Sequence, residues 1–321
     1  MRRRDFLLLS ATTFCVSWSG LCLATGYPYR EARVMVGFPP NGPVDIAGRL
    51  VSRLLSERLG QPFVVENKPG ESGNVATREV VHADPDGYTL LIFGPVNTIN
   101  AALRTDLGFD FARDIAPVAG LYSVPLLVEV NPSLPITSPE DFLSFARANP
   151  GRLKVGYAGR GTPQHFGIEL LRWMAGLDLQ LLPFVGSAPA LQALVAGEVD
   201  AMFDPLPSSI GLVRSGKLRP VAVTSSSRSS ILPEIPAMAE VVPNYEAGSW
   251  FAVGAPQSTS PDVIAVLSRV VQEGLTEAQV RDKIGELGGM PLALSPEQLS
   301  IFVNAEIARA RKVIEATGIL R

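Results

Sequence analysis

Short runs of β-branched and apolar residues alternate with helical stretches along nearly the whole chain, and this alternation limits the possible folds more than any other feature. Strands that alternate with helices are typical of βα units, whose strands pair in parallel. We therefore expect an α/β fold with largely parallel sheets. The predicted strands are residues 34–38, 63–66, 88–93, 125–130, 153–157, 179–184, 200–203 and 218–224.

Two kinds of signal predict the helices between these strands. Apolar residues at helical spacing give one stripe to residues 44–59 and another to residues 263–271. Ser138 and Ser295 are each followed by proline. Serine caps free backbone N–H groups and proline is favoured at the first helical position, so both serines indicate helix starts. We interpret these caps as structural.

The first 24 residues have the layout of an export signal. Arginines at positions 2–4 precede an apolar stretch at residues 6–16, and small residues end the segment at Ala24. The apolar stretch is too short to anchor the protein in a bilayer. Arg3 and Arg4 fit the twin-arginine pattern, so that route and the general route both stay open. We expect residues 1–24 to be an export signal peptide and the mature protein to be periplasmic.

Cleavage after Ala24 removes both cysteines, Cys15 and Cys22, from the 321-residue chain. The mature chain then has no thiol chemistry, no disulfide and no cysteine-based metal site. Three arginines and one aspartate leave with the signal, so 25 basic and 30 acidic side chains remain and the net charge is −5. This charge argues against nucleic acid or an anionic membrane as a partner.

The 297 residues that follow Ala24 predict about two domains. No long Ser/Gly-rich or charged linker divides them. The chain is therefore expected to cross between two lobes on ordered strands, near residues 122–128 and 248–254. We expect residues 25–123 plus 249–321 to form the first lobe and residues 124–248 the second. The helices after Pro261 would then pack back on the first lobe.

The mature sequence lacks the common catalytic and metal-binding motifs. Its two histidines, His82 and His165, do not have the spacing or the cysteine partners of a zinc site. It contains no G-x-S-x-G, G-x-x-x-x-G-K-[ST] or G-x-G-x-x-G motif. Aspartates such as Asp45 and Asp204 show no spacing that singles out a pair for acid/base catalysis. We predict that the protein is not an enzyme and uses no cofactor or metal.

Three turns rich in glycine and proline follow predicted strands and open predicted helices, at residues 39–43, 159–163 and 185–189. Such a turn leaves backbone N–H groups free at the positive end of a helix, and small residues let an anion approach them. Thr162 and Ser187 add a hydroxyl. Each turn indicates either a site for a ligand carboxylate or ordinary helix capping, and both interpretations stay open for any single turn.

Three motifs occur in order along the chain: PPNGPVDIAGRL at residues 39–50, GRGTPQHFG at 159–167 and GSAPALQALVAGEVDAMFDPLPS at 186–208. Together with ADPDGYTLLIF at 83–93, this series resembles the Bug family, the extracytoplasmic solute receptors of tripartite tricarboxylate transporters. The resemblance extends from residue 27 to near the C terminus.

The resemblance implies a two-lobed periplasmic-binding-protein (Venus flytrap) fold, type II-like, with a small organic acid in the cleft. Backbone groups and bridging waters from both lobes would hold one carboxylate of this acid. The implied partners are the membrane permease subunits of a tripartite tricarboxylate transporter, and we expect a monomer. Carried over by position, the ligand-binding residues are Phe38, Pro40, Asn41, Gly42, Pro43, Asp45, Tyr157, Gly159, Gly161, Thr162, His165, Gly186, Ser187 and Asp204.

Four positions depart from the pattern of the family. Asn41 stands where glycine is usual, Val44 where a hydroxyl residue is common, Tyr157 where a small hydroxyl residue is common, and Pro205 where asparagine is frequent. The lost hydroxyls and the added phenol favour a more apolar or aromatic acid as the ligand.

For several side chains the sequence allows two interpretations. His165 either donates to a ligand carboxylate or satisfies a loop carbonyl. Asp45 either caps the loop or selects ligands with an amine or hydroxyl. Trp250 and Phe251 either floor the cleft or pack in the core, and Arg160 either pairs with a second carboxylate or is solvated.

Two functions fit these expectations. One is a transport receptor that delivers its ligand to a membrane permease, and the other is a periplasmic sensor that presents its bound acid to a membrane signalling protein. Neighbouring genes distinguish them, because membrane subunits beside the gene would indicate transport and a histidine kinase would indicate sensing.

Overall fold

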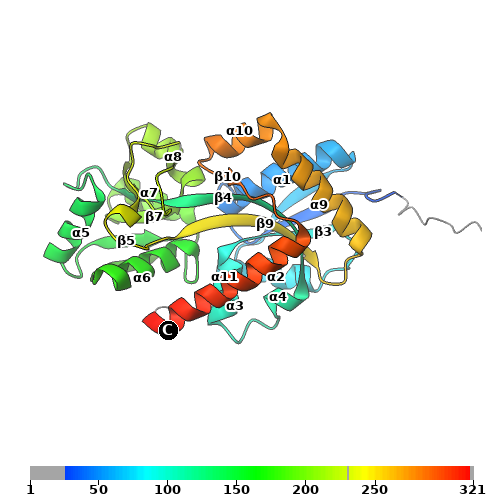
Figure 1. The fold of residues 1–321 in the computed structure, drawn as a ribbon, viewed down its shortest axis with the longest axis horizontal. Coiled ribbons are helices and arrows are strands. Elements are labelled where there is room, and N and C mark those ends of the chain that lie inside the picture. Colours follow the sequence, from blue (N-terminus) through cyan, green and yellow to red (C-terminus); the bar gives the residue numbers. More distant parts are fainter. Residues whose placement is uncertain (1–25, 230, 319–321) are drawn as a thin grey trace, which may run out of the picture.

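The computed structural model describes residues 26–229 and 231–318, which form a mixed α/β fold (Figure 1). The export signal predicted for residues 1–24 lies outside the described residues. The strands are β1 (Ala32–Val36), β2 (Phe63–Asn67), β3 (Thr89–Phe93), β4 (Ile115–Val130), β5 (Lys154–Tyr157), β6 (Gln180–Pro183), β7 (Ala201–Pro205), β8 (Arg219–Val223), β9 (Gly248–Pro256) and β10 (Met290–Pro291). The helices are α1 (Pro43–Leu59), α2 (Asn74–Val81), α3 (Pro95–Leu103), α4 (Phe111–Asp114), α5 (Pro139–Ala148), α6 (Pro163–Ala175), α7 (Ser187–Ala196), α8 (Leu206–Arg214), α9 (Pro261–Thr276), α10 (Ala278–Glu286) and α11 (Pro296–Thr317), with short 3-10 turns at η1 (Glu71–Gly73) and η2 (Met238–Glu240).

The predicted strands all overlap observed strands, and the predicted helix starts are confirmed. Ser138 caps α5 by accepting a hydrogen bond from the Asp141 N–H, and Ser295 caps α11 by accepting one from the Gln298 N–H. Proline occupies the first turn of both helices, where no intrahelical donor is needed. These local signals therefore fix where the two helices begin.

The strands are hydrogen-bonded in the order β2-β1-β3-β9-β4-β7-β5-β6, and β8 and β10 also pair with β4. Pairing is parallel at both flanks, where β1 lies between β2 and β3 and where β5 lies between β6 and β7. In the centre, β9 is antiparallel to β3 and β4, and β4 is antiparallel to β7, β8 and β10. The prediction of largely parallel sheets is thus right for the flanks and wrong for the centre. The reason is that the chain leaves one flank on β4 and returns on β9 in the opposite direction.

Strand β4 belongs to both parts of the sheet. Its residues 115–125 pair with β9, and its residues 126–130 pair with β7 and β8. The strand begins ten residues before the predicted segment. Pro117 and Pro125 weaken the strand signal, and register shifts accompany the Pro117 region. Figure 1 shows β4 and β9 running side by side through the middle of the molecule.

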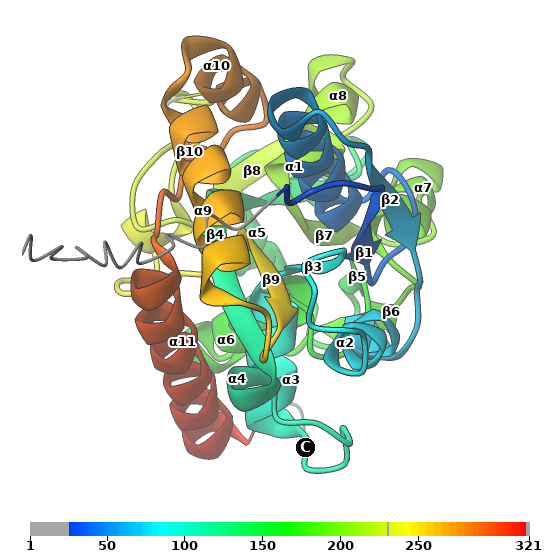
Figure 2. The same ribbon diagram turned by 90° about the vertical axis from the view of Figure 1, so that its right-hand side faces the viewer.

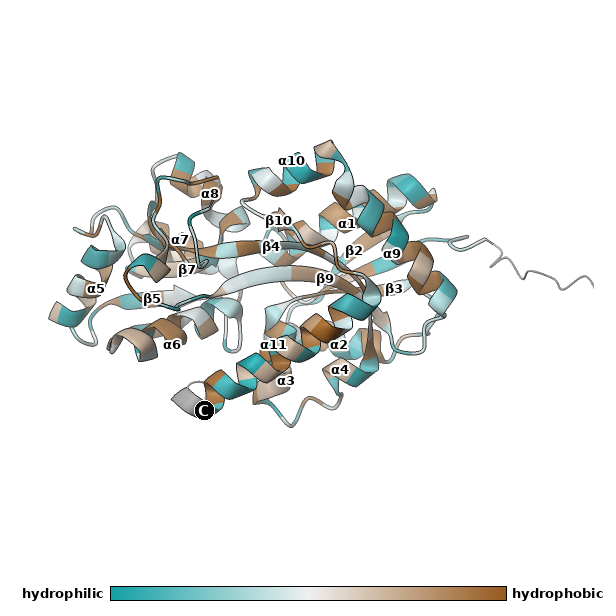
Figure 3. Cartoon of the chain, viewed as in Figure 1, coloured by the Kyte–Doolittle hydropathy of each residue, from teal (hydrophilic) through white to brown (hydrophobic). Residues whose placement is uncertain are grey.

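Two large cores lie at opposite ends of β4. One contains Val34, Leu55 and Tyr122 and joins β1, β3, β9 and α1, whereas the other contains Phe142 and Phe203 and joins β5, β7, α5 and α6. Burial of each large apolar side chain contributes roughly 1.5–3 kcal/mol. Figure 3 shows this pattern as hydrophobic inner strands and helices with hydrophilic outer faces.

The C-terminal helices cover both faces of the part of the sheet that contains β9, and only α9 and α10 contribute to the first core. Helix α9 packs on α1 and β4 against the face of β9 that carries Phe251 and Val253, whereas α11 packs on α3 and β4 against the opposite face, which carries Trp250 and Ala252. Figure 2 shows both helices. The expectation that the helices after Pro261 pack back on the first lobe stays a prediction, and Ala310 of α11 lies in the second core. Within residues 26–229 and 231–318, no helix combines the length and the apolar composition needed to cross a bilayer.

Gly120 generates a prediction about how β4 is held. The Leu292 N–H donates to the Leu121 carbonyl at 3.0 Å, and a Cβ at Gly120 would lie 2.2 Å from the Leu292 carbonyl oxygen. We expect Gly120→Ala to lower the free energy of unfolding by about 1–3 kcal/mol, because this backbone contact must open. Urea unfolding measures the change.

Gly211→Ala on α8 is the matched control, because a Cβ there meets no atom within 4 Å. It should leave stability unchanged or raise it by up to about 1 kcal/mol. Equal unfolding midpoints for the two variants would contradict the close packing at Gly120.

Candidate functional site

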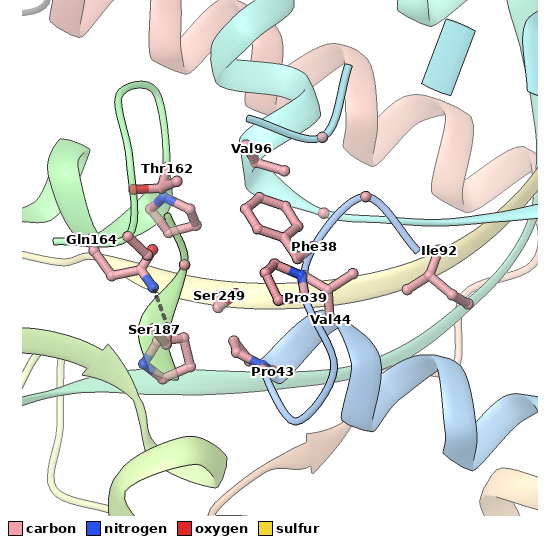
Figure 4. Close-up of a pocket in the computed structure, with 18 of the residues that line it drawn as sticks. Phe38, Pro39, Pro43, Val44, Ile92, Val96, Thr162, Gln164, Ser187 and Ser249 are labelled. Atoms are coloured by element: carbon pink, nitrogen blue, oxygen red, sulfur yellow. Dashed lines mark hydrogen bonds between the residues drawn. The ribbon is translucent and has the colours of Figure 1, made fainter. Parts of the chain in front are cut away.

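The N termini of four helices meet at one cavity, which is lined by residues from the first turns of α1, α3, α6 and α7 (Figure 4). Its empty volume is about 720 Å³, a figure that includes space open to solvent. The helices come from both ends of β4, so the cavity lies between the two cores.

The turns that begin these helices are built for close approach to the backbone. Gly42 precedes α1, Gly94 precedes α3 and Gly186 precedes α7, and each of these glycines lines the cavity. Proline stands at the start of α1, α3 and α6. Because the first backbone N–H groups of a helix have no acceptor within it, these four turns carry free donors and a positive partial charge.

The three turns singled out in the sequence therefore lie together, and a fourth was missed. That fourth turn is Gly94-Pro95, between β3 and α3. It carries the same signal, a glycine after a strand and a proline at the first helical position. Applying the same criterion to every strand end would have found it.

The structure divides the fourteen predicted ligand-binding residues into two groups. Seven line the cavity: Phe38, Pro40, Gly42, Pro43, Thr162, Gly186 and Ser187. The other seven lie outside its lining: Asn41, Asp45, Tyr157, Gly159, Gly161, His165 and Asp204. Several members of the second group support the walls through hydrogen bonds, which the next paragraphs describe.

Asp45 caps the loop before α1, as one of its two interpretations predicted. Its buried carboxylate accepts hydrogen bonds from the Asn41 N–H at 2.9 Å, from Asn67 Nδ2 at 2.9 Å and from Arg49 Nε at 2.8 Å. Burial acts to raise the pKa of Asp45, but the hydrogen bonds from Arg49, Asn41 and Asn67 together outweigh it and hold the pKa below its usual value. The carboxylate thus fixes residues 41–45 in place.

His165 stabilises the turn at residues 159–163. Its Nδ1 accepts a hydrogen bond from the Gly161 N–H at 3.3 Å, and its ring stacks on Tyr157 with centroids 4.4 Å apart. Thr162 Oγ1 donates to the Gly159 carbonyl at 2.7 Å and accepts from the His165 N–H. These contacts rigidify the turn and occupy the Thr162 hydroxyl. His165 therefore satisfies a loop N–H rather than the loop carbonyl that the sequence suggested.

Asp204 lies fully buried behind the wall formed by α6 and α7. It accepts hydrogen bonds from Ser187 Oγ at 2.5 Å and Gln164 Nε2 at 3.3 Å, and from Ser208 Oγ. Burial raises the pKa of Asp204 to about 6, although these three hydrogen bonds oppose the shift. The charged form of this carboxyl is therefore costly.

A second buried carboxyl, Glu129 on β4, faces Asp204. Neither of its carboxyl oxygens has a hydrogen-bond partner within the described residues. Burial raises the pKa of Glu129 well above its usual range, and the nearby Asp204 adds to the shift. Burial and the charge of Asp204 therefore both disfavour the ionised form of Glu129.

Other lining residues escaped the sequence analysis because distant segments bring them together. Gln164, Ile92, Val96 and Ser249 belong to this group. Phe251, for which the sequence allowed either a place on the cleft floor or a place in the core, lines the cavity. Its neighbour Trp250 instead packs in the core against Phe93 and Phe302.

Charged side chains are kept out of the cavity. None of its lining residues in the described part of the chain is Lys, Arg, His, Asp or Glu. Arg160, the cation nearest in sequence to the second-lobe turn, is exposed. Within residues 26–229 and 231–318, no group of three or more His, Cys, Asp or Glu side chains is arranged to hold a metal ion.

The raised pKa of Asp204 predicts a pH dependence of stability. The folded protein takes up a proton at about pH 6, whereas the unfolded chain does so near pH 3.8. Between these values the folded state binds more protons, so the free energy of unfolding should fall by about 2–3 kcal/mol as the pH rises. Asp204→Asn should lack this decline. Glu129 contributes a decline of the same sign in both proteins, and this decline is smaller in Asp204→Asn because the Asp204 charge adds to the raised pKa of Glu129. The difference between the urea unfolding curves at each pH therefore reports the Asp204 carboxyl together with its effect on Glu129. Curves that stay parallel from pH 4 to pH 6 would contradict the assignment.

Comparison with known proteins agrees with this geometry. Residues 47–319 match the family model described as "Tripartite tricarboxylate transporter family receptor". The protein BugT from Bordetella pertussis is 34% identical over 299 residues, covering 92% of this chain and 91% of BugT. Among solved structures, R. palustris Rpa4515 with adipate is 38% identical with a TM-score of 0.89, covering 91% of this chain and 98% of that one. MatC from Rhodopseudomonas palustris with bound malate is 31% identical with a TM-score of 0.84, covering 90% and 100%.

These matches confirm both the resemblance found in the sequence and the two-lobed fold of periplasmic solute-binding proteins. With four helix N termini around one cavity and a family model that spans most of its length, the chain belongs to the receptors of the tripartite tricarboxylate transporter family.

Proposed function

We propose that the protein is an extracytoplasmic receptor that captures a small organic acid through its carboxylate and delivers it to a tripartite tricarboxylate-type membrane transporter. The observation that carries the proposal is the meeting of the N termini of α1, α3, α6 and α7 at one cavity without any lining cation. Free backbone N–H groups and aligned helix dipoles favour an anion there. A carboxylate satisfies several such donors at once.

The relatives support this choice of ligand class. The solved structures of Rpa4515 and MatC contain adipate and malate, which are both carboxylic acids. The family consists of receptors rather than enzymes, and binding without chemistry fits a cavity without a charged lining side chain. Permease subunits are accordingly the proposed partners.

We assign residues 25–123 plus 249–321 to the first lobe and residues 124–248 to the second. The exchange of partners along β4, from β9 to β7 and β8 after residue 125, supports this boundary. Ten of the fourteen predicted site residues have one of two proposed roles. Those that line the cavity contact the acid, and Asp45, His165 and Asp204 hold the contacting turns in place.

Export is part of the proposal, because a receptor for a periplasmic solute must leave the cytoplasm. Residues 1–24 are the proposed signal. Mass spectrometry of the periplasmic protein should find an N terminus near residues 25–27. An intact form beginning with Met1 in the cytoplasm would contradict export.

Neutralising the carboxylate of the ligand tests the binding mode. We expect hexanoate or adipate to bind more tightly than its own amide, by at least about tenfold, because each hydrogen bond to a charged group contributes about 1.5–3 kcal/mol. Isothermal titration of each acid and its amide measures the ratio. Equal affinity within both pairs would overturn the proposed function.

Gly42→Val supplies a variant in which the site is blocked. A Cβ at Gly42 would meet only the Pro39 carbonyl oxygen, at 3.5 Å, and the backbone has φ −84°, so the fold accepts a side chain there. The variant should lose acid binding and keep its melting temperature. Gly161 is a poorer choice, since its φ is +74° and a Cβ would lie 2.7 Å from Asn100 Oδ1.

A further inference from the structure

The side-chain amide of Gln164 lies in the wall of the cavity, in the first turn of α6. The side chain is buried, and its Nε2 donates to Ser187 Oγ at 3.2 Å and to Asp204 Oδ1 at 3.3 Å. Figure 4 shows the first of these bonds as a dashed line between the two labelled side chains. The amide nitrogen is therefore already bonded within the protein.

The amide oxygen of Gln164 has no such partner. Oε1 accepts no hydrogen bond within residues 26–229 and 231–318. It is also not one of the polar atoms of these residues that are both completely enclosed and unpaired. The oxygen and the nitrogen of a planar amide point in different directions, so Oε1 faces away from Asp204. Since Gln164 lines the cavity, Oε1 is open to a ligand there.

Asp204 fixes this orientation of the amide. Ser187 Oγ donates its only hydrogen to Asp204 Oδ1, at 2.5 Å. Burial raises the pKa of Asp204 to about 6, so most of the carboxyl is ionised at pH 7 and both groups can only accept from Gln164. Turning the amide over would place Oε1 against two acceptors and would remove their Nε2 donor, which costs about 1–3 kcal/mol for a buried group.

The other polar side chains of the lining do not impose the same requirement on a ligand. Thr77, Asn97 and Thr162 are hydrogen-bonded at both their donor and their acceptor atoms. The Ser249 side chain has no partner among the described residues, but a hydroxyl can either donate or accept. Gln164 Oε1 can only accept, so this side-chain atom specifies the chemistry of the ligand atom that it meets.

We propose that Gln164, oriented by Asp204, is a specificity-determining residue that selects an organic acid with a hydrogen-bond donor, a hydroxyl or an amino group, in addition to its carboxylate. This inference rests on the proposed function, since it assumes that the free N–H groups of the helix turns hold the carboxylate. The donor of the ligand meets Oε1. An acid without such a donor leaves Oε1 buried without a hydrogen atom to accept, which weakens its binding.

Isothermal titration with a matched set of acids tests the proposal. The parent acid is whichever of hexanoate and adipate binds more tightly, and the set adds its 2-hydroxy, 3-hydroxy, 2-amino and 3-amino derivatives. We expect at least one derivative to bind about fivefold or more tightly than the parent, because it completes one buried hydrogen bond. The hydroxy and amino derivatives identify which donor is preferred.

If no derivative binds more tightly than the parent, the proposal is wrong. That result leaves the proposed function standing, because the proposed function fails only if the acids bind no better than their amides.

Gln164→Met removes the acceptor and keeps a side chain of similar length. The affinity of the preferred derivative divided by that of the parent should fall to within about twofold of one. The ratio is the measure, because loss of the Nε2 bonds can weaken both acids alike. Gln192→Met on α7 is the matched control, since Gln192 is exposed and lies outside the cavity lining, and it should keep the wild-type ratio. A wild-type ratio in Gln164→Met would overturn the proposal.

Asp204→Asn tests the orienting role of the carboxylate. Asparagine offers Gln164 a donor as well as an acceptor, so both orientations of the Gln164 amide become possible. The affinity ratio should therefore lie between those of the wild type and Gln164→Met. A purely structural defect would lower the melting temperature and weaken all acids alike without moving this ratio. A ratio equal to that of the wild type would overturn the assignment of Asp204 as the positioning residue.

Discussion

The antiparallel pairing of β4 with β9 is the constraint on which the rest of the structure depends. These two strands carry the chain between the cores, so every turn that reaches the cavity is positioned relative to them. Tyr122 of β4 packs against Phe251 of β9 with ring centroids 5.0 Å apart, and Phe251 in turn lines the cavity. The first core and the part of the cavity lining that Phe251 forms are therefore one packed unit.

Contacts other than these two strands also link the two walls of the cavity. Ser72 Oγ donates to the Arg160 carbonyl at 2.6 Å, which joins the turn before α2 to the turn before α6. Pro39 lies near Gly186, 3.5 Å from the position of a Cβ on that glycine. Both contacts hold the walls of the cavity in the arrangement that the structure shows. An acid that bridges the turns adds its own hydrogen bonds to this arrangement and thereby stabilises it.

The sequence predicts the parts of this structure that depend on local signals. The helix starts at Ser138 and Ser295, the strand runs and the three glycine and proline turns all follow from neighbouring residues. Interpretation from neighbouring residues fails where the hydrogen-bond partner of a side chain lies far away in the sequence. The hydroxyls of Thr162 and Ser187 looked available to a ligand, yet Ser187 donates to Asp204, 17 residues further along the chain. Ser249 and Ile92 reach the cavity only because β9 pairs with β3 and β4, which no spacing along the chain reveals.

The distribution of charge around the cavity supports the proposed binding of a carboxylate. Helix N termini supply a positive field that is fixed by the backbone and carries no side-chain charge to be desolvated. Of the acidic groups behind the walls, Asp45 is compensated by Arg49, and Asp204 is hydrogen-bonded by Ser187, Gln164 and Ser208. A single carboxylate then meets donors that have no competing partner. The apolar walls strengthen that attraction by excluding water.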